Sequence, residues 1–419
     1  MDLTLILLFI FYLIAPAVIL YLCYRYPFLD KIGSVIIAYV FGLVLGNVGI
    51  LPGLGEVLYE KIITHPHTNV KDVKNMLDAG LITANDLIGF QVYQLKDILM
   101  SITVLLAIPL MLFSTNLKSW KKLAGKVVLS LIIALFSVLS TITLGFFLFR
   151  NSSIDDLWKI SGLLVGVYTG GTPNLASLKL MLKVDANTYI LTHTYDLIIG
   201  VFYLGFLITV GKNLFGKFLP PFHNDIASIK NAEHVTNPKA PDTTKKRVQV
   251  IIKGLALSIG IAGVSLGIAT LFPENLLMVT VILSITSLGI IASNADKINQ
   301  LPLTFETGMY LILIFSLVVA SLADISNFTG INPSLLGYIS MAVFGSLLIH
   351  VLLCKLFKID ADTTMITSVS FICSPPFVPV IAGALGNKQI IISGITVGII
   401  GYAIGNYLGY FLANFLKMF

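Results

Sequence analysis

Two apolar segments of the chain each contain a cluster of helix-breaking and polar residues. The first reads Tyr168-Thr-Gly-Gly-Thr-Pro-Asn-Leu-Ala-Ser177, and the second reads Ser370-Phe-Ile-Cys-Ser-Pro-Pro-Phe-Val-Pro379. Proline inside a helix removes a backbone donor and clashes with the carbonyl four residues back, so we expect 168–174 and 373–376 to be non-helical. The freed amides can bind an anion, and the freed carbonyls can coordinate a cation.

The two breaks occupy matching places in the two halves of the chain. Aligning Pro173 with Pro375 pairs Thr172 with Ser374, and a short polar break and a Gly-containing span follow each of them. Such paired interruptions point to a transporter binding site, and we expect the two to lie within one helix diameter, ~10 Å, of each other. The alternative is a pair of packing kinks, because proline and glycine are common in membrane helices. The predicted substrate-binding residues are Thr169, Gly170, Gly171, Thr172, Pro173, Asn174, Ser177, Ser374, Pro375 and Pro376.

A carboxylate lies inside the apolar segment that follows the first break. Asp196 is in the segment 188–210, and His193, three residues earlier, is on nearly the same helix face. Ionisable residues inside membrane spans are functional hypotheses by default, and a carboxylate removed from water can carry a proton or a sodium ion. We therefore predict Asp196, His193 and Thr194 as the ion-coupling group. The alternative is a static His–Asp pair that joins two helices.

The elements that must position these residues are apolar helices. Of the 419 residues, 56% are hydrophobic and 11% are charged, against ~25% charged residues in a typical soluble domain. Runs such as 3–22 and 127–149 have the ~20 residues that a helix needs to cross a bilayer. We predict an all-α polytopic membrane protein with about twelve hydrophobic segments. They are 3–22, 32–50, 98–115, 127–149, 158–183, 188–210, 247–271, 276–293, 308–324, 333–354, 363–386 and 389–416.

Basic residues predict the division of the chain and its orientation. The stretch 211–247 carries seven bases against three acids and reads as a basic cytoplasmic linker (211–246). It would join an N-terminal transmembrane half, 1–210, to a C-terminal half, 247–419. Each half alone is consistent with the positive-inside rule, and the halves then run in opposite directions. We therefore predict inverted repeats, related by a pseudo-two-fold axis in the membrane plane.

The same rule produces a conflict within the N-terminal half. The lysines of 118–126, the linker, and Lys355 with Lys358 should all face the cytoplasm. Three apolar segments lie between the first of these clusters and the linker, and three crossings would put the two on opposite sides. Either one segment in 127–210 does not cross fully, or one basic cluster breaks the rule. The sequence leaves both alternatives open.

The Gly-Gly-Thr-Pro-Asn run, the Ser-Pro-Pro partner and the twelve-segment pattern resemble the membrane protein family catalogued as domain-of-unknown-function family 819. The resemblance covers essentially the whole chain. That family is grouped with the cation/proton antiporter and bile acid–sodium symporter superfamily, which implies an inverted-repeat transporter whose two broken helices cross near the bilayer midplane. Related antiporters place their ion-carrying aspartate where Asp196 stands, but Tyr195 replaces the second acid of their signature. The resemblance implies no particular substrate.

Together these features predict a secondary active transporter for a small solute, with an anion as one option, coupled to sodium or protons. No Walker-type loop is present, so ATP drive is not expected. One alternative is an intramembrane enzyme, although the chain has neither a Gly-x-Ser-x-Gly elbow nor a His-Glu-x-x-His motif. The other is a channel-like facilitator without coupling. We expect no enzyme activity, and no cofactor apart from a sodium ion or proton as coupling ion.

The remaining features limit partners and location. The expected partners are a small-molecule solute and the lipid bilayer, with no nucleic acid, and a homodimer is left open. The first apolar run follows Met1-Asp2 without a positive n-region, so we expect a retained span and a multi-pass protein of the bacterial inner (plasma) membrane. The spacing of Cys23, Cys354 and Cys373 favours neither a disulfide framework nor a zinc site. A glycine stripe in the last segment predicts close helix packing: Gly398, Gly401, Gly405 and Gly409.

Overall fold

The part of the chain that the structure describes is helical. A computed structural model describes residues 3–32, 34–53, 55, 57–58, 69–114, 125–152, 154–222, 243–322 and 332–419, and none of these lies in a strand. The helices pack as two compact units, Met1–Val104 with Tyr310–Thr329, and Leu105–Met309 with Gly330–Phe419. The halves 1–210 and 247–419 stay a prediction, and residues 223–242 of the expected linker lie outside the described residues.

Seven helical stretches among the described residues are long and apolar enough to cross a bilayer. They are α1 (Leu3–Arg25), α6 (Ala84–Phe113), α8 (Gly125–Phe149), α10 (Ala186–Phe206) with η1 (Leu207–Gly211) and α11 (Lys212–Phe215), α13 (Thr244–Ala269), α17 (Pro333–Ser340) with η4 (Met341–Gly345) and α18 (Ser346–Leu356), and α21 (Ile391–Leu416). Shorter apolar helices are α3 (Ser34–Asn47), α14 (Leu277–Ala292) and α16 (Thr304–Ala320). The connecting helices are α2 (Pro27–Ile32), α5 (Val70–Asp78), η2 (Glu274–Leu276), α15 (Asp296–Asn299) and η6 (Lys388–Ile390).

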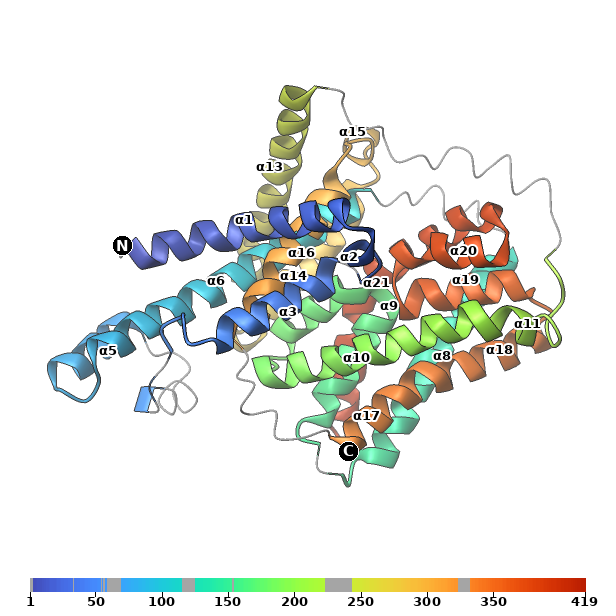
Figure 1. Cartoon of the computed structure of the whole chain (residues 1–419), viewed down its shortest axis with the longest axis horizontal. Coiled ribbons are helices and arrows are strands. Elements are labelled where there is room, and N and C mark those ends of the chain that lie inside the picture. Colours follow the sequence, from blue (N-terminus) through green and yellow to red (C-terminus); the bar gives the residue numbers. More distant parts are fainter. Residues whose placement is uncertain are drawn as a thin grey trace. The chain divides into compact units, whose positions relative to one another are not determined.

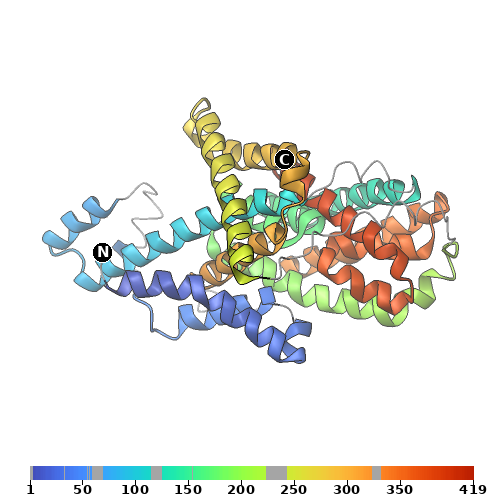
Figure 2. The ribbon, with the colours of Figure 1, turned by 90° about the horizontal axis from the view of Figure 1, so that it is seen from above.

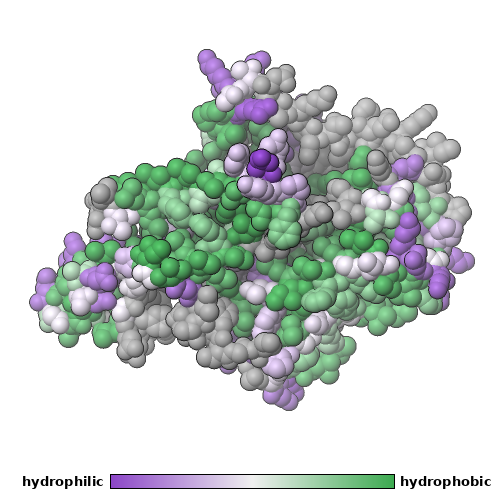
Figure 3. Space-filling model, in the orientation of Figure 1, coloured by the Kyte–Doolittle hydropathy of each residue, from purple (hydrophilic) through white to green (hydrophobic). Residues whose placement is uncertain are grey.

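Large apolar side chains lie on the outward faces of these helices. Leu148, Val201, Phe202 and Leu352 are each more than half exposed. Hydrophobic residues cover much of the visible helical surface, and hydrophilic residues gather near helix ends (Figure 3). Exposed apolar area of this extent fits hydrocarbon as the surrounding solvent. The prediction of an all-α polytopic membrane protein is confirmed in this form, while the twelve segments and the inverted repeat stay predictions.

The helix α9 (Leu157–Met181) is a hairpin of two antiparallel arms. Its backbone is non-helical at Gly171, where φ is 62° and ψ is −159°. A Cβ added at Gly162 would lie 2.7 Å from Leu182 Cδ1, although a straight helix would separate these residues by about 30 Å. Likewise, a Cβ at Gly166 would lie 3.3 Å from the carbonyl oxygen of Asn174. The chain therefore doubles back at Gly171, and both ends of α9 lie at the same end of the bundle.

A second hairpin consists of α19 (Ala361–Ile372), η5 (Pro375–Phe377) and α20 (Val378–Leu385). Its turn is at Ser374, where φ is 79° and ψ is 159°. Its base is closed by Asn387, whose Nδ2 donates a 2.8 Å hydrogen bond to Asp362 Oδ2. The sequence correctly predicted breaks in segments 158–183 and 363–386. The prediction that two broken helices cross is wrong, because the positive φ at each turn reverses the chain direction.

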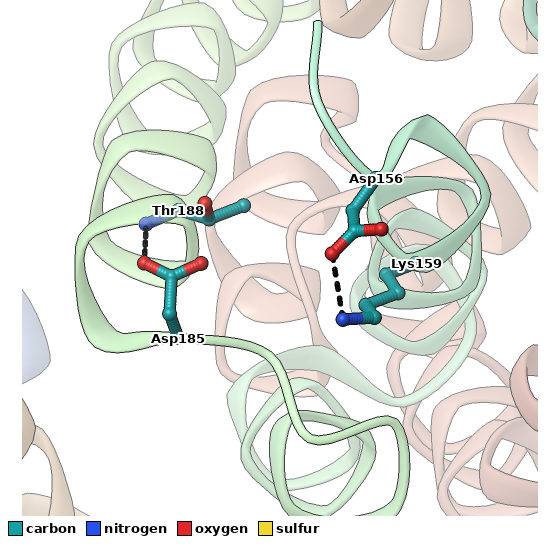
Figure 4. A network of polar contacts seen from close by, with 4 residues as sticks. All are labelled: Asp156, Lys159, Asp185 and Thr188. Atoms are coloured by element: carbon teal, nitrogen blue, oxygen red, sulfur yellow. Dashed lines mark hydrogen bonds and ion pairs between the residues drawn. The ribbon is translucent and has the colours of Figure 1, made fainter. Parts of the chain in front are cut away.

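The two hairpins begin at opposite ends of one continuous helix, α10–η1–α11. The first hairpin ends beside Asp185, which caps α10 by accepting a 2.9 Å hydrogen bond from the Thr188 amide. Figure 4 shows this cap together with Asp156, the residue that precedes α9. At the other end of this helix, Lys212 Nζ donates to the carbonyl oxygens of Ala384 and Leu385, at 3.2 Å each, and α20 lies alongside (Figure 2).

Re-entrance of α9 resolves the conflict over orientation. Only α8 and α10–η1–α11 cross between Lys126 and Lys212, so these two lysines lie at the same end of the second unit. The pair α17–α18 runs antiparallel to α8 and beside α10 (Figure 1), because Tyr338 Oη donates to the carbonyl of Ile142 at 3.0 Å and His350 Nε2 lies 3.1 Å from Ser130 Oγ.

The third basic cluster lies at that same end. Lys355 Nζ lies 5.5 Å from the centre of the Phe218 ring, and Phe218 follows α11. Of the first cluster, Lys118, Lys121 and Lys122 lie outside the described residues. The hairpin geometry of α9 agrees with the alternative in which one segment does not cross, and the number of crossings stays a prediction. That this end faces the cytoplasm stays a prediction.

A buried lysine organises the first unit. Lys96, on α6, is 5% exposed, and its Nζ donates a 2.9 Å hydrogen bond to the carbonyl of Ser321. Ser321 follows the C-terminus of α16, where a cation complements the helix dipole. The Ser321 hydroxyl pairs with Tyr12 Oη at 2.7 Å. The polar stretch 51–97 of the sequence therefore includes the first turns of α6, which begins at Ala84.

The hairpin geometry of α9 predicts the outcome of cysteine labelling from the two sides of the membrane. In a cysteine-free background, Asp155→Cys and Lys183→Cys should react with an impermeant maleimide from one side, because both residues are exposed at the base of α9. Lys217→Cys, at the far end of α10–η1–α11, should react from the opposite side. Labelling of Asp155→Cys and Lys183→Cys from opposite sides would show that α9 crosses.

Candidate functional site

The turns of the two hairpins meet inside the second unit. A Cβ added at Gly171 would overlap the hydroxyl of Ser374 and would lie 3.8 Å from the ring of Tyr402. The prediction that the two breaks lie together is thereby confirmed. The prediction that all of 168–174 is non-helical is wrong, because Gly171 alone leaves the helical region and its neighbours retain helical backbone.

Gly171 and Ser374 share an unusual backbone conformation. Both combine a φ of 62° to 79° with a ψ near ±160°, a region that is essentially restricted to glycine. A serine in this region costs on the order of 1–3 kcal/mol, and it persists only where the surrounding structure holds it in place. Strain of this kind concentrates at ligand sites, so the conformation of Ser374 makes this turn a candidate site.

The last helix, α21, packs against both hairpins through its glycine stripe. A Cβ added at any glycine of the stripe would come within 3 Å of another group. Gly398 faces Pro375, and Gly409 faces Leu178. Gly401 and Gly405 face the end of the first arm of α9. The prediction of close helix packing from this spacing is confirmed. Because larger residues would not fit, α21 fixes the positions of both turns.

The predicted substrate-binding residues separate into two groups. Three have side chains that hold α9 in place: Thr169 Oγ1 donates to the Val165 carbonyl at 2.7 Å, Ser177 Oγ to the Pro173 carbonyl at 2.8 Å, and Asn174 Nδ2 to the Gly401 carbonyl at 3.3 Å. The others lie at the meeting point itself, where the side chains of Thr172 and Ser374 are half-buried. This second group comprises Gly170, Gly171, Thr172, Pro173, Ser374, Pro375 and, by its backbone, Pro376. Their role as ligands stays a prediction.

Asp196 lies on α10 between residues of both hairpins. Its side chain is 11% exposed. The Tyr168 hydroxyl, from the first arm of α9, faces the carboxylate. Cys373, at the end of α19, lies within electrostatic reach of the same group. Because Tyr168 and Cys373 each stand within three residues of a hairpin turn, Asp196 is adjacent to the place where the turns meet.

The other predicted members of the ion-coupling group differ in placement. His193 is buried, and its Nε2 lies 3.9 Å from Asp196 Oδ2, too far for a direct hydrogen bond. Thr194 is half-buried and, two residues from Asp196, projects from a different side of α10. Tyr195 accepts a 2.8 Å hydrogen bond from the Asn332 amide and thus ties α10 to the start of α17. The coupling role of Asp196, His193 and Thr194 stays a prediction.

Sequence reasoning missed two hydroxyls beside Asp196. Tyr168 Oη and Thr192 Oγ1 are fully buried and have no well-formed hydrogen bond to any described residue. Buried helical hydroxyls such as those of Thr141 and Thr286 donate to the carbonyl four residues back, at 2.7 and 2.8 Å, whereas Ser265 Oγ on α13 also has no partner among the described residues. Thr192 lies four residues before Asp196 and so shares its helix face. That spacing was the available signal in the sequence.

The described residues contain no group of three or more His, Cys, Asp or Glu side chains that could hold a metal ion. Zinc and other transition metals prefer such nitrogen and sulfur ligands. Beside the carboxylate of Asp196 lies the Tyr168 hydroxyl, and oxygen ligands of this kind suit a proton or a hard cation.

Apolar spans and two re-entrant hairpins that meet beside a buried carboxylate define a multi-pass membrane protein with an interior site. Residues 74–419 match the family described as "Protein of unknown function (DUF819)", and the chain belongs to that family. The chain is 26% identical over 340 residues to the "Uncharacterized membrane protein YjcL" of Bacillus subtilis (strain 168). The aligned region covers 77% of this chain and 84% of that protein. The resemblance to the family is confirmed; its grouping with the antiporter and symporter superfamily stays a prediction.

The contact between the turns predicts the effect of adding one methyl group. Gly171→Ala should destabilise the protein by more than about 2 kcal/mol, because Ala is strained at this φ and its Cβ meets Ser374. The control is Gly205→Ala on α10, where a Cβ meets nothing within 4 Å, and which should be neutral or stabilising by up to about 1 kcal/mol. Unfolding of both purified variants in detergent measures the difference. Equal stability of the two would contradict the close contact.

Proposed function

We propose that this protein is a secondary active transporter whose solute binds where the turns at Gly171 and Ser374 meet. The observation that carries the proposal is the contact of these two turns beside the buried Asp196. Backbone that leaves the helix at membrane depth is tolerated only where it is buried in protein or lines a wet cavity. Paired interruptions of this kind are the usual location of transporter binding sites.

The chemistry of the meeting point favours a small anionic solute. The second arm of α9 and the helix α20 both begin at the turns, so the partial positive charge of both N-termini is directed there. The half-buried hydroxyls of Thr172 and Ser374 add hydrogen-bonding groups. A carboxylate or phosphate of modest size would satisfy this arrangement.

The order of the elements supports an alternating-access mechanism. A span, a hairpin and a span follow one another twice, as α8, α9 and α10–η1–α11 and again as α17–η4–α18, α19–α20 and α21. In an inverted repeat, each hairpin would separate the site from one side of the membrane. Opening one hairpin at a time would then expose the solute alternately. This arrangement, with the position of Asp196, also supports the link to the cation/proton antiporter and bile acid–sodium symporter superfamily.

Asp196 supports coupled transport over a channel-like facilitator. A facilitator needs no buried carboxylate, whereas a coupled transporter needs a group that binds the ion. An intramembrane enzyme would need an activated nucleophile. Among the described residues, Cys373 has Asp196 within electrostatic reach but no base within hydrogen-bonding distance. The proposal therefore includes no enzyme activity, and it places the protein in the bacterial inner membrane.

The coupling role of Asp196 predicts a loss of gradient-driven uptake. In proteoliposomes screened with small anions under imposed sodium or proton gradients, Asp196→Asn should fold normally and lose concentrative uptake, because it keeps the shape and removes the charge. Asp155→Asn, at an exposed position, is the control and should retain uptake. Full gradient dependence in well-folded Asp196→Asn would exclude the residue as the coupling group. A fall in melting temperature for both Asp196→Asn and His193→Ala, with coupling retained, would identify a static pair.

The strained backbone of Ser374 predicts opposite effects on stability and on solute binding. Ser374→Gly should raise the free energy of unfolding by about 1 kcal/mol, because glycine adopts this conformation without strain. The same variant should bind the solute more weakly, because it lacks the hydroxyl. Ser374→Ala should lose the same affinity without the gain in stability. Thermal unfolding and uptake on both variants separate the two effects. If Ser374→Gly transports normally, the hydroxyl is not a ligand.

A further inference from the structure

Three buried oxygen-bearing side chains lie near the hairpin turns: the Tyr168 hydroxyl faces the Asp196 carboxylate, and Thr192 shares a helix face with Asp196. They come from two elements: Tyr168 from the first arm of α9, and Thr192 and Asp196 from one face of α10. Tyr168 is 0% exposed, and its hydroxyl faces the Asp196 carboxylate. Thr192 is 1% exposed, and its hydroxyl has no hydrogen-bond partner among the described residues. An orphaned hydroxyl such as that of Thr192 costs several kcal/mol when buried in a membrane protein, and a ligand that binds all three oxygens would satisfy it together with the buried carboxylate.

We infer that Asp196, Thr192 and Tyr168 form a sodium site. The inference rests on the proposed function, since it names the coupling ion and replaces Thr194 by Thr192 and Tyr168 among its ligands. Sodium is a hard monovalent cation that binds to carboxylate, hydroxyl and carbonyl oxygens, and the single negative charge of Asp196 matches its charge.

The first arm of α9 can supply further ligands. The last four carbonyl groups of a helix have no partner within it, and this arm ends at Gly170, two residues after Tyr168. Half-helix C-terminal ends are known to coordinate sodium at such breaks. The site therefore joins a side-chain cage on α10 to the backbone of the hairpin turn.

A proton satisfies this arrangement less well than sodium. A proton on Asp196 binds to one carboxylate oxygen and removes its negative charge, so it does not draw the hydroxyl oxygens of Tyr168 and Thr192 to a common point. A cation draws on all three oxygens at once. His193 lies 3.9 Å from one oxygen of the carboxylate, and its nitrogen is a poor ligand for sodium, so it is not among the proposed ligands.

Purified protein in detergent tests the site without any transport. At constant ionic strength, sodium chloride should raise the melting temperature by about 3 °C or more in a saturable manner, whereas potassium chloride and choline chloride should not. Thr192→Val and Tyr168→Phe should each shift the sodium midpoint upward about tenfold or more, and Asp196→Asn should abolish the effect. Thr192→Ser, which keeps the hydroxyl, should retain it. Thr209→Val, exposed on the same continuous helix, is the matched control and should behave as the unaltered protein.

Cys373 provides a second measurement at the site itself. In a Cys23→Ala, Cys354→Ala background, sodium should slow alkylation of Cys373 by about fivefold or more, because the thiol lies beside Asp196. Equal melting temperatures in the three salts, an unchanged midpoint in Thr192→Val, or an unchanged alkylation rate would each overturn the site.

The outcomes also separate this inference from the proposed function. Uptake driven by a proton gradient in sodium-free vesicles, with no sodium effect on melting, would overturn the sodium site and leave the transporter. Sodium binding in a protein that moves no solute under any gradient would overturn the transporter and leave the site.

Discussion

The structure of the second unit depends on how a peptide chain can turn inside hydrocarbon. Each unpaired backbone group costs several kcal/mol there, so a turn at that depth must be short and covered by protein. Gly171 and Ser374 make their turns with a single residue in a conformation reserved for glycine, and each turn covers the other. The mutual contact of the turns is thus the condition for both hairpins to exist.

The helix α21 completes this cover. Its glycines bring its backbone against α9 and against Pro375, so the orphan backbone of the turns meets another helix instead of lipid. Asn174 adds a direct hydrogen bond to the backbone of α21 at 3.3 Å. The result is a polar interior that needs few charged residues, which agrees with a chain in which 11% of residues are charged. Asp196 and its neighbouring hydroxyls can lie next to this interior because the surrounding helices separate them from lipid.

Much of this organisation follows from the sequence. Apolar runs give the spans, Gly-Gly-Thr-Pro and Ser-Pro-Pro give the breaks, and the three-to-four-residue glycine spacing gives the packing face of α21. The direction of the chain after a break does not follow, because proline indicates where a helix ends, whereas the sign of φ at Gly171 decides whether it turns back. The conflict between the positions of the lysine clusters and the positive-inside rule was the feature of the sequence that indicated this reversal. Thr192 and Tyr168 escaped notice because a hydroxyl becomes unusual only when its acceptors are known in three dimensions. The role of Lys96 does not follow from the sequence for a similar reason, since its acceptor, the Ser321 carbonyl, is 225 residues away.

The packing of α21 has a consequence for biosynthesis. The first hairpin leaves the ribosome more than 200 residues before the glycines that cover it, because α9 ends at Met181 and the stripe lies at Gly398–Gly409. Until α21 is synthesised, the face of α9 that these glycines cover must be shielded by lipid, by other helices or by the insertion machinery. Contacts between such distant parts of a chain form late and slowly. Assembly of the polar interior therefore waits for α21, and a ribosome that stops before α21 releases a chain whose spans can insert but whose site has not been assembled.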